Sequence, residues 1–314
     1  MELKSFDENA IDATLEKAYE QLGGNSRNSG YRYDIPTLFN YNAFLVISDV
    51  VTTKVGTLTS KIDRFNEWKS INGEKGYDDT CVDKLDINIA GLFNKARILD
   101  VVKNNLFFIQ DKNDQPIKIM AQYHQYFGVN KALAGVLGAV KPNGNGKAGL
   151  VWHTQGSGKS FSMVMLAHRL LQHRALNVPT VVVLTDRIDL DDQLYKTFFS
   201  ARNYLKCEPM LATSRADLVK KLSKIQQGGI IFSTIGKFDK DNLPSNLRNN
   251  IIVMTDEAHR SHYGLEATMK LNLETMQAYK KYGTAKFLHD ALPNAIYIGC
   301  TGTPVETKDR STSS

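Results

Sequence analysis

Residues 149–160 read Gly-Leu-Val-Trp-His-Thr-Gln-Gly-Ser-Gly-Lys-Ser, a short apolar run followed by a glycine-rich loop. Residues 153–160, called the P-loop below, fit the pattern G-x-x-x-x-G-K-[ST] except at the first position, where His153 replaces glycine. Gly156 and Gly158 permit backbone conformations and close approaches that a Cβ would prevent. Backbone N–H groups of such a loop, at the start of a helix, can surround phosphate oxygens. The stretch therefore predicts a phosphate site between a strand and a helix.

Two side chains of the P-loop carry the remaining chemistry. Lys159 is expected to reach the β- and γ-phosphates of a nucleotide, and the Ser160 hydroxyl is expected to bind Mg²⁺. A chance Gly-Lys-Ser turn is the competing interpretation, and the flanking strand and helix argue against it. The residues predicted to bind the nucleotide are Thr154, Gln155, Gly156, Ser157, Gly158, Lys159 and Ser160.

Beyond the P-loop, the chain alternates helical patterns with short β-branched runs. A helical pattern covers residues 161–173, and the apolar runs that follow lie at 180–185, 230–233, 251–254 and 295–299. Uninterrupted apolar strands are typical of a sheet covered on both faces. The alternation predicts an α/β fold in which helices flank a parallel sheet.

Polar motifs follow two of these predicted strands. Asp256 would bind Mg²⁺ beside the P-loop, and Glu257 would be the base that activates water. Alone, such an acidic pair could simply begin a helix, where the dipole favours carboxylates. Thr301-Gly302-Thr303-Pro304 could sense the γ-phosphate, although alone it reads as a turn. The joint order of the three motifs points to a nucleic-acid motor that uses ATP and Mg²⁺.

Composition excludes several classes of protein. The chain has 314 residues, 42% hydrophobic and 23% charged, which is ordinary for a globular protein and long enough for two domains. Its three cysteines lie far apart, match no metal-ligand spacing and favour a reducing cytosol. Neither a membrane-length apolar run nor a signal peptide is present. We therefore predict a cytoplasmic location and no membrane association.

Charge is unevenly distributed along the chain. Its 39 basic and 33 acidic side chains give a net charge of +6, yet residues 115–185 contain no acidic side chain. A basic stretch is usually a solvated face. Because this one surrounds the P-loop, we favour a polyanionic partner such as nucleic acid.

Several stretches resemble, almost word for word, the motor and restriction subunit of type I restriction enzymes, a superfamily-2 double-stranded DNA translocase. They lie at residues 38–42, 56–60, 152–160 and 256–261. The resemblance implies a RecA-like lobe that, in the full enzyme, couples ATP hydrolysis to translocation and to cleavage of foreign unmodified DNA. It implies double-stranded DNA and the methylase (M) and specificity (S) subunits as partners.

The resemblance also implies roles for residues outside the P-loop. Gln125 would read the edge of adenine. Residues 185–191 resemble the DNA-contacting motif Ia, which would bring Asp186 and Arg187 to the DNA. Residues 301–303, that is Thr301, Gly302 and Thr303, would couple the nucleotide state to DNA.

Glu2-Leu3-Lys4 sits where the family's PD-(D/E)xK nuclease carries its Glu-x-Lys. In that chemistry, Glu2 would bind Mg²⁺ and Lys4 would position or activate water, so both are implied as catalytic residues. The motif's tyrosine, expected four residues after Gln21, is missing, and either Tyr31 or Tyr33 could replace it.

The implied organisation is a partial α/β PD-(D/E)xK nuclease domain and linker over residues 1–110, followed by the first RecA-like lobe over 111–314. The upstream aspartate of the nuclease and the second motor lobe are not in the sequence. We therefore expect a truncated subunit that binds ATP, hydrolyses little of it and does not cut DNA. Two alternatives stay open, namely a non-catalytic module that docks on DNA or on the methylase complex, and another superfamily-2 helicase.

Overall fold

A computed structural model describes the chain over residues 1–4, 14–24, 29–49, 51–74, 84–111, 113–185, 188–238, 244–258, 268–271, 278–281, 284–302, 306–307 and 310–311. Two compact units form, residues 1–127 and residues 128–314, called here the N-terminal and C-terminal units. Among the helices that the structure describes, none is long and apolar enough to cross a membrane.

The N-terminal unit contains a small three-stranded sheet. Strand β1 (Glu2–Leu3) pairs in parallel with β2 (Leu45–Ser48), which pairs antiparallel with β3 (Thr53–Gly56). Helix α1 (Leu15–Gln21) contacts β1 and β2. The apolar core between them consists of Ala18, Tyr19, Leu22, Phe39, Leu45, Ile47 and Phe65. All four residues of β2 are buried.

The rest of this unit is mostly helical. Its further elements are α2 (Tyr31–Asp34), η1 (Pro36–Phe39), η2 (Ile62–Arg64), α3 (Lys84–Gly91) and α4 (Lys95–Asn104). Asn94 caps α4, since its side chain accepts hydrogen bonds from the backbone N–H groups of Ala96 and Arg97.

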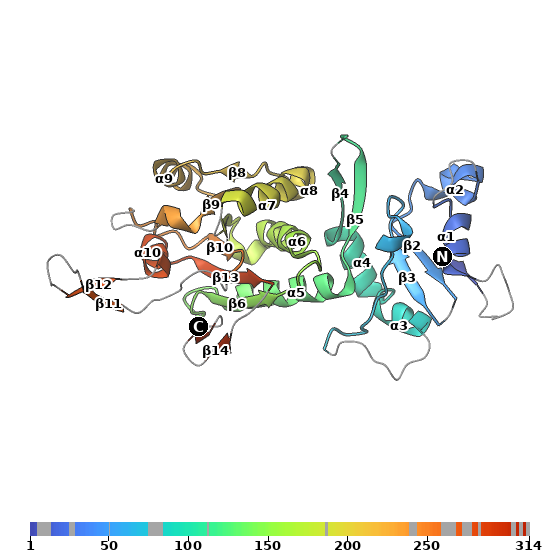
Figure 1. The fold of residues 1–314 in the computed structure, drawn as a ribbon, viewed down its shortest axis with the longest axis horizontal. Helices are drawn as coiled ribbons and strands as arrows, with labels where there is room; N and C mark the ends of the chain where they lie inside the picture. Colours follow the sequence, from blue (N-terminus) through green and yellow to red (C-terminus); the bar gives the residue numbers. More distant parts are fainter. Residues whose placement is uncertain are drawn as a thin grey trace. The chain divides into compact units, whose positions relative to one another are not determined.

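A β-hairpin follows α4, formed by β4 (Leu106–Gln110) and β5 (Pro116–Met120) (Figure 1). The run 111–116, where the sequence suggested the boundary between domains, is the connection inside this hairpin. Ala121 N donates to Asn105 O (2.9 Å) and closes the hairpin base. The compact units therefore divide later, after Phe127, within helix α5 (Tyr123–Gly138).

The C-terminal unit is built on a six-stranded sheet in the order β6-β13-β10-β7-β9-β8. Every pair of neighbouring strands in it is parallel. The strands are β6 (Lys147–Trp152), β7 (Thr180–Thr185), β8 (Met210–Leu211), β9 (Ile230–Thr234), β10 (Ile251–Thr255) and β13 (Ile296–Thr301). The predicted α/β fold with a parallel sheet is confirmed, and β7 and β10 are buried along their whole length.

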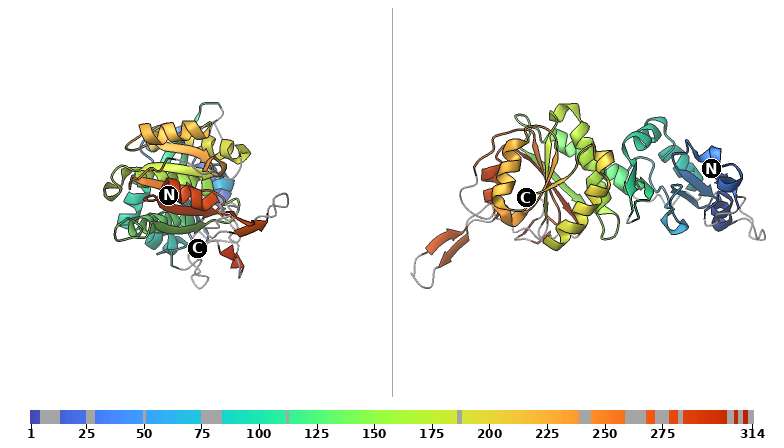
Figure 2. Two further views of the ribbon diagram at one scale, coloured as in Figure 1. Left: turned by 90° about the vertical axis from the view of Figure 1, so that its left-hand side faces the viewer. Right: turned by 90° about the horizontal axis from the view of Figure 1, so that it is seen from above.

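Helices cover both faces of this sheet (Figure 2). They are α6 (Lys159–Gln172), α7 (Ile188–Ser200), α8 (Arg202–Leu205), α9 (Arg215–Lys224) and α10 (Thr284–Ala291). On one face, α9 and α10 place Leu218, Leu222 and Leu288 against the sheet residues Val182 and Val253. Short elements complete the unit: η3 (Arg174–Leu176), η4 (Ile235–Phe238), and the hairpins β11 (Thr268–Leu271) with β12 (Ala278–Lys281) and β14 (Glu306–Thr307) with β15 (Arg310–Ser311).

Candidate functional site

Sheet topology brings the three predicted motifs to one edge. Strands β6, β13 and β10 are neighbours and run parallel, so their carboxyl ends lie side by side. Trp152, the last residue of β6, pairs with Thr301, the last residue of β13. The P-loop leaves the first of these ends, residues 301–302 end the second, and Asp256-Glu257 follow the third.

The P-loop has the backbone that its glycines predict. Gly156 and Gly158 have φ values of 83° and 81°, in the left-handed region that L-residues rarely adopt. Ser157 N donates to Thr154 O (3.0 Å), and the Ser157 hydroxyl donates to the same oxygen (2.6 Å). Gly158 is the N-cap of α6, which begins at Lys159. The loop therefore ends at a helix N-terminus, where backbone N–H groups favour an anion.

Lys159 joins the P-loop to the acidic pair. Its Nζ lies 2.8 Å from Asp256 Oδ1 and also donates to Glu257 Oε1. The Lys159 and Asp256 side chains are 17% and 12% exposed, so water screens their ion pair only in part. Burial alone would lower the pKa of Lys159, but hydrogen bonds and charge from the two carboxylates outweigh it and raise that pKa. The structure thus brings together the lysine and both carboxylates that the sequence singled out.

The acidic pair is held by its neighbours on both sides. Asp256 N donates to Leu184 O of β7 (2.7 Å), and Ala258 N donates to Cys300 O of β13 (3.1 Å). Between these anchors, Glu257 adopts φ 48°, and its N–H donates to Asp256 Oδ1 (2.9 Å). A left-handed glutamate costs roughly 1–3 kcal/mol, which the surrounding bonds must offset. In this conformation the Glu257 carboxylate accepts from Lys159 Nζ.

Ser160, the predicted second Mg²⁺ ligand, lies half-buried in the first turn of α6, next to Lys159. Within the described ranges, no group of three His, Cys, Asp or Glu side chains could hold a metal ion. A cation at this edge would therefore need oxygen donors other than a carboxylate cluster.

Two contacts at this edge were not predicted from the sequence. The indole N–H of Trp152 donates to Gly302 O (3.1 Å), and His153 N donates to Thr301 O (3.0 Å). The sequence feature that could have pointed to Trp152 is its position directly before the P-loop. Thr303, Asp186 and Arg187 lie outside the described residues.

Gln125 is buried in α5, where its Oε1 accepts a hydrogen bond from Gln122 N (2.9 Å). It belongs to the N-terminal unit, whereas the P-loop belongs to the C-terminal unit. Its adenine-reading role stays a prediction.

Glu2 and Lys4 lie together in the N-terminal unit. Lys4 Nζ is 3.4 Å from Glu2 Oε1 and donates to Gln21 Oε1 of α1. Both charged side chains are about one-sixth exposed, at 15% for Lys4 and 16% for Glu2. The Glu-x-Lys pair and the glutamine of the implied nuclease motif are thus neighbours in space.

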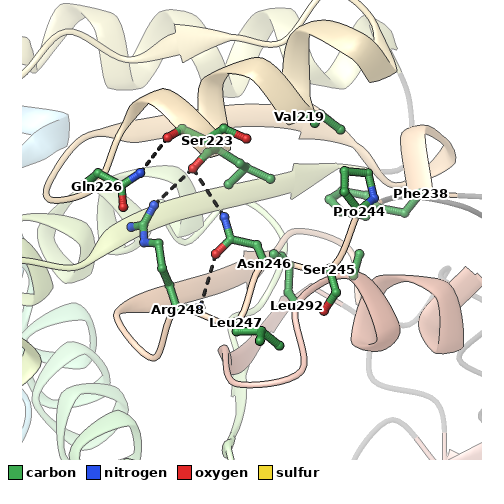
Figure 3. A pocket seen from close by; sticks show the side chains of 12 residues that line it. Val219, Ser223, Gln226, Phe238, Pro244, Ser245, Asn246, Leu247, Arg248 and Leu292 are labelled. Atoms are coloured by element: carbon green, nitrogen blue, oxygen red, sulfur yellow. Dashed lines mark hydrogen bonds between the residues drawn. The ribbon is translucent and has the colours of Figure 1, made fainter.

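A hollow of about 310 Å³ lies among α9, η4 and α10 (Figure 3). None of its lining residues belongs to the P-loop or the acidic pair. Its one charged lining residue, Arg248, donates to Leu222 O, Ile225 O, Thr180 Oγ1 and Asn250 Oδ1. Arg248 therefore links neighbouring segments of the C-terminal unit. The hollow is not part of the candidate site.

Comparison with known proteins agrees with this geometry. Residues 124–314 match the family model of the SWI2/SNF2 ATPase. The type I restriction enzyme HindI endonuclease subunit of Haemophilus influenzae is 41% identical over 90% of this chain and 27% of its own length. A Methanocaldococcus jannaschii protein assigned as the type I restriction enzyme MjaIXP endonuclease subunit is 37% identical over 89% of this chain and 26% of its own length.

A solved structure, a nuclease-deletion mutant of the Type ISP restriction-modification enzyme LlaGI with a DNA substrate mimic, is also similar. It shares 16% identity over 62% of this chain and 19% of its own, with a TM-score of 0.38. The chain spans about a quarter of the length of the curated relatives named above. It is homologous to type I restriction enzyme endonuclease subunits, and it belongs to the SWI2/SNF2 ATPase family.

Proposed function

We propose that this chain is the ATP-binding motor lobe of a type I restriction endonuclease subunit. The observation that carries the proposal is Lys159, held between Asp256 and Glu257 directly behind a loop with two left-handed glycines. Family membership supports ATP as the nucleotide. In the whole protein, ATP hydrolysis would drive translocation along double-stranded DNA and cleavage of unmodified DNA.

The residues present fit Mg²⁺ and ATP. The P-loop offers backbone N–H groups at a helix N-terminus, and the Ser160 hydroxyl and the Asp256 carboxylate are oxygen donors of the kind Mg²⁺ prefers. When bound, Mg²⁺–ATP supplies the phosphoryl group that is transferred to water. Lys159 would exchange its carboxylate partners for phosphate oxygens. Glu257, freed from the lysine, would accept a proton from the attacking water.

A thermal unfolding experiment with and without Mg²⁺–ATP tests this proposal. Wild-type protein should gain about 2.7 kcal/mol at a nucleotide concentration of about 100 times Kd. Lys159→Ala should lose this gain, because the phosphates lose their cation. Glu257→Gln should keep it, since the base acts only in catalysis. Lys147→Ala, at an exposed lysine of β6, is the matched control and should behave as wild type.

The outcomes separate the candidate functions. If wild-type protein gains no stability from ATP, the motor proposal fails and a non-catalytic docking module becomes the better account. If Glu257→Gln also loses the gain, the role given to Glu257 is wrong.

The remaining roles belong to the same proposal. Residues 1–110 would be the C-terminal part of a nuclease domain with its linker, and residues 111–314 the first RecA-like lobe. The contact of Lys4 with Glu2 and Gln21 supports the nuclease assignment of Glu2 and Lys4. Double-stranded DNA, which Asp186, Arg187 and residues 301–303 would contact, and the M and S subunits would be the partners, in the cytoplasm.

For a polypeptide limited to these 314 residues, we propose ATP binding with slow turnover. An arginine finger supplied by another lobe accelerates related reactions by about 10³–10⁵-fold. The described residues contain a single six-stranded parallel sheet, which corresponds to one lobe. A steady-state ATPase assay with duplex DNA should therefore give a turnover of less than about 1 s⁻¹, below the usual range of about 1–10³ s⁻¹ for enzymes.

A further inference from the structure

Trp152 is unusually exposed for a tryptophan that has a fixed partner. The residue is 65% exposed at the end of β6, whereas Trp68, the other tryptophan of the chain, is 4% exposed. Yet the Trp152 indole is oriented, because its N–H donates to Gly302 O (3.1 Å). An aromatic side chain contributes most to stability when it is buried, so burial does not explain this placement.

The indole bond extends the link between β6 and β13. Trp152 pairs with Thr301 at the end of the strand ladder, and His153 N donates to Thr301 O (3.0 Å). In the part of the chain that the structure describes, the indole bond reaches Gly302, one residue beyond this backbone pairing. Residues 301–302 are therefore held by the strand that leads directly into the P-loop.

A side-chain contact continues the connection into the P-loop. His153 is buried, and its Nδ1 lies 3.3 Å from Ser157 Oγ. The single hydroxyl hydrogen of Ser157 is donated to Thr154 O (2.6 Å), so in this contact the Nδ1–H of His153 donates and Ser157 Oγ accepts. Ser157 of the P-loop thus contacts His153, which directly follows Trp152 in the chain.

We propose that Trp152 is a positioning residue that transmits the nucleotide state of the P-loop to residues 301–302 through its indole hydrogen bond. The inference rests on the proposed function, because it requires a nucleotide at the P-loop. It differs from a stabilising role, since the bond is exposed and joins two segments that backbone pairing already brings together. Trp152 would then matter little for binding of the nucleotide and much for the response of residues 301–302.

Hydrogen exchange of the 314-residue chain, with and without Mg²⁺–ATPγS, tests the proposal. In wild-type protein, the nucleotide should slow exchange both in the P-loop and in peptides that contain Thr301 and Gly302. Trp152→Phe keeps an aromatic ring and removes the donor. It should bind nucleotide within about twofold of wild type but lose most of the slowing at residues 301–302, where one hydrogen bond corresponds to about two- to tenfold in rate.

Three further variants make the result decisive. Trp152→Leu removes the same donor with a different side chain, so the conclusion does not depend on the folding of one variant. Leu211→Ala changes an exposed apolar side chain on β8, at the other edge of the sheet, and should leave both responses as in wild type. Lys159→Ala should remove both responses.

Failure of this inference can be told apart from failure of the proposed function. If nucleotide slows exchange in the P-loop of wild-type protein but the Trp152 variants keep the full response at 301–302, Trp152 is not the link. If the variants bind nucleotide more than about tenfold more weakly, Trp152 supports the P-loop itself and the positioning role is wrong. If wild-type protein shows no slowing in the P-loop, the proposed function itself fails.

Discussion

Asp256 has more bonding partners than a carboxylate that merely begins a helix would need. It accepts from Lys159 Nζ (2.8 Å) and from Glu257 N (2.9 Å), while its own N–H is bonded to β7. The side chain is thus fixed in place beside the P-loop before any ligand arrives. Preorganised oxygen donors of this kind are what a hard cation requires.

We predict that Asp256→Asn selectively removes the Mg²⁺-dependent part of nucleotide binding. The amide keeps the size of the side chain but loses its negative charge. The increase in ATP affinity that Mg²⁺ produces should therefore be at least about tenfold smaller than in wild type. Titrations of ATP with Mg²⁺ and with EDTA measure this difference. Asp217→Asn, at a carboxylate on α9 paired with Lys221, is the control. An unchanged Mg²⁺ increment in Asp256→Asn would assign the cation to other ligands.

The P-loop and the acidic pair could be predicted from sequence because their chemistry needs particular residues next to the ends of strands. Trp152 could not, since its partner Gly302 is brought near only by the pairing of β6 with β13. The left-handed backbone of Glu257 is likewise a product of its anchors on β7 and β13. Such contacts depend on strand order, which the sequence of a single strand does not contain.

At the scale of elements, α6 and α8 meet through a buried histidine. The His168 ring stacks on Tyr204, with 3.8 Å between ring centroids and 13° between planes. The Nδ1–H of His168 donates to Tyr204 O (2.8 Å). Burial is the main cause that lowers the pKa of His168 from 6.5 to about 4, so the folded state favours the neutral imidazole.

We predict an acid-sensitive contribution to stability from this contact. Because the folded pKa lies below the unfolded value of 6.5, the contribution is complete above pH 6.5 and is lost as the pH falls toward 4. The loss can reach about 3 kcal/mol. Urea unfolding at pH 7, 5.5 and 4.5 should show a smaller decrease for His168→Gln, which keeps a donor but does not titrate. Equal pH dependence in both proteins would contradict this account.

Strands were predicted well where both faces of the sheet are covered, and less well in a hairpin. The strands of the C-terminal unit are uninterrupted apolar runs, and all of those predicted are present. The short apolar run Leu106–Ile109 lies in strand β4 of a hairpin. Periodicity alone does not identify such a run, since it fits a strand and a helix equally well.

For the molecule as a whole, the distribution of charge matters more than the net value of +6. In the acid-free segment 115–185, Lys131, Lys147 and Arg174 are exposed, while Lys141 donates to Pro293 O and Lys159 contacts the carboxylates. An external polyanion can reach these three exposed side chains. Lys147 begins β6 and Arg174 follows the C-terminal end of α6, so both lie at the ends of these elements away from the P-loop.

We predict that duplex DNA binds this chain with a steep dependence on salt. Each phosphate that a lysine or arginine neutralises releases counterions and contributes about −0.9 to the slope of log K against log[salt]. Fluorescence anisotropy between about 50 and 200 mM salt should therefore give a slope of several units.

Replacing Lys131, Lys147 and Arg174 with glutamine should flatten the slope by about 0.9 for each side chain that contacts a phosphate. Lys220 and Lys224 on α9, changed in the same way, are the control for a loss of net charge alone. A flat salt dependence in wild-type protein would exclude DNA binding through this segment, and equal effects of the two sets would mean that DNA responds only to overall charge.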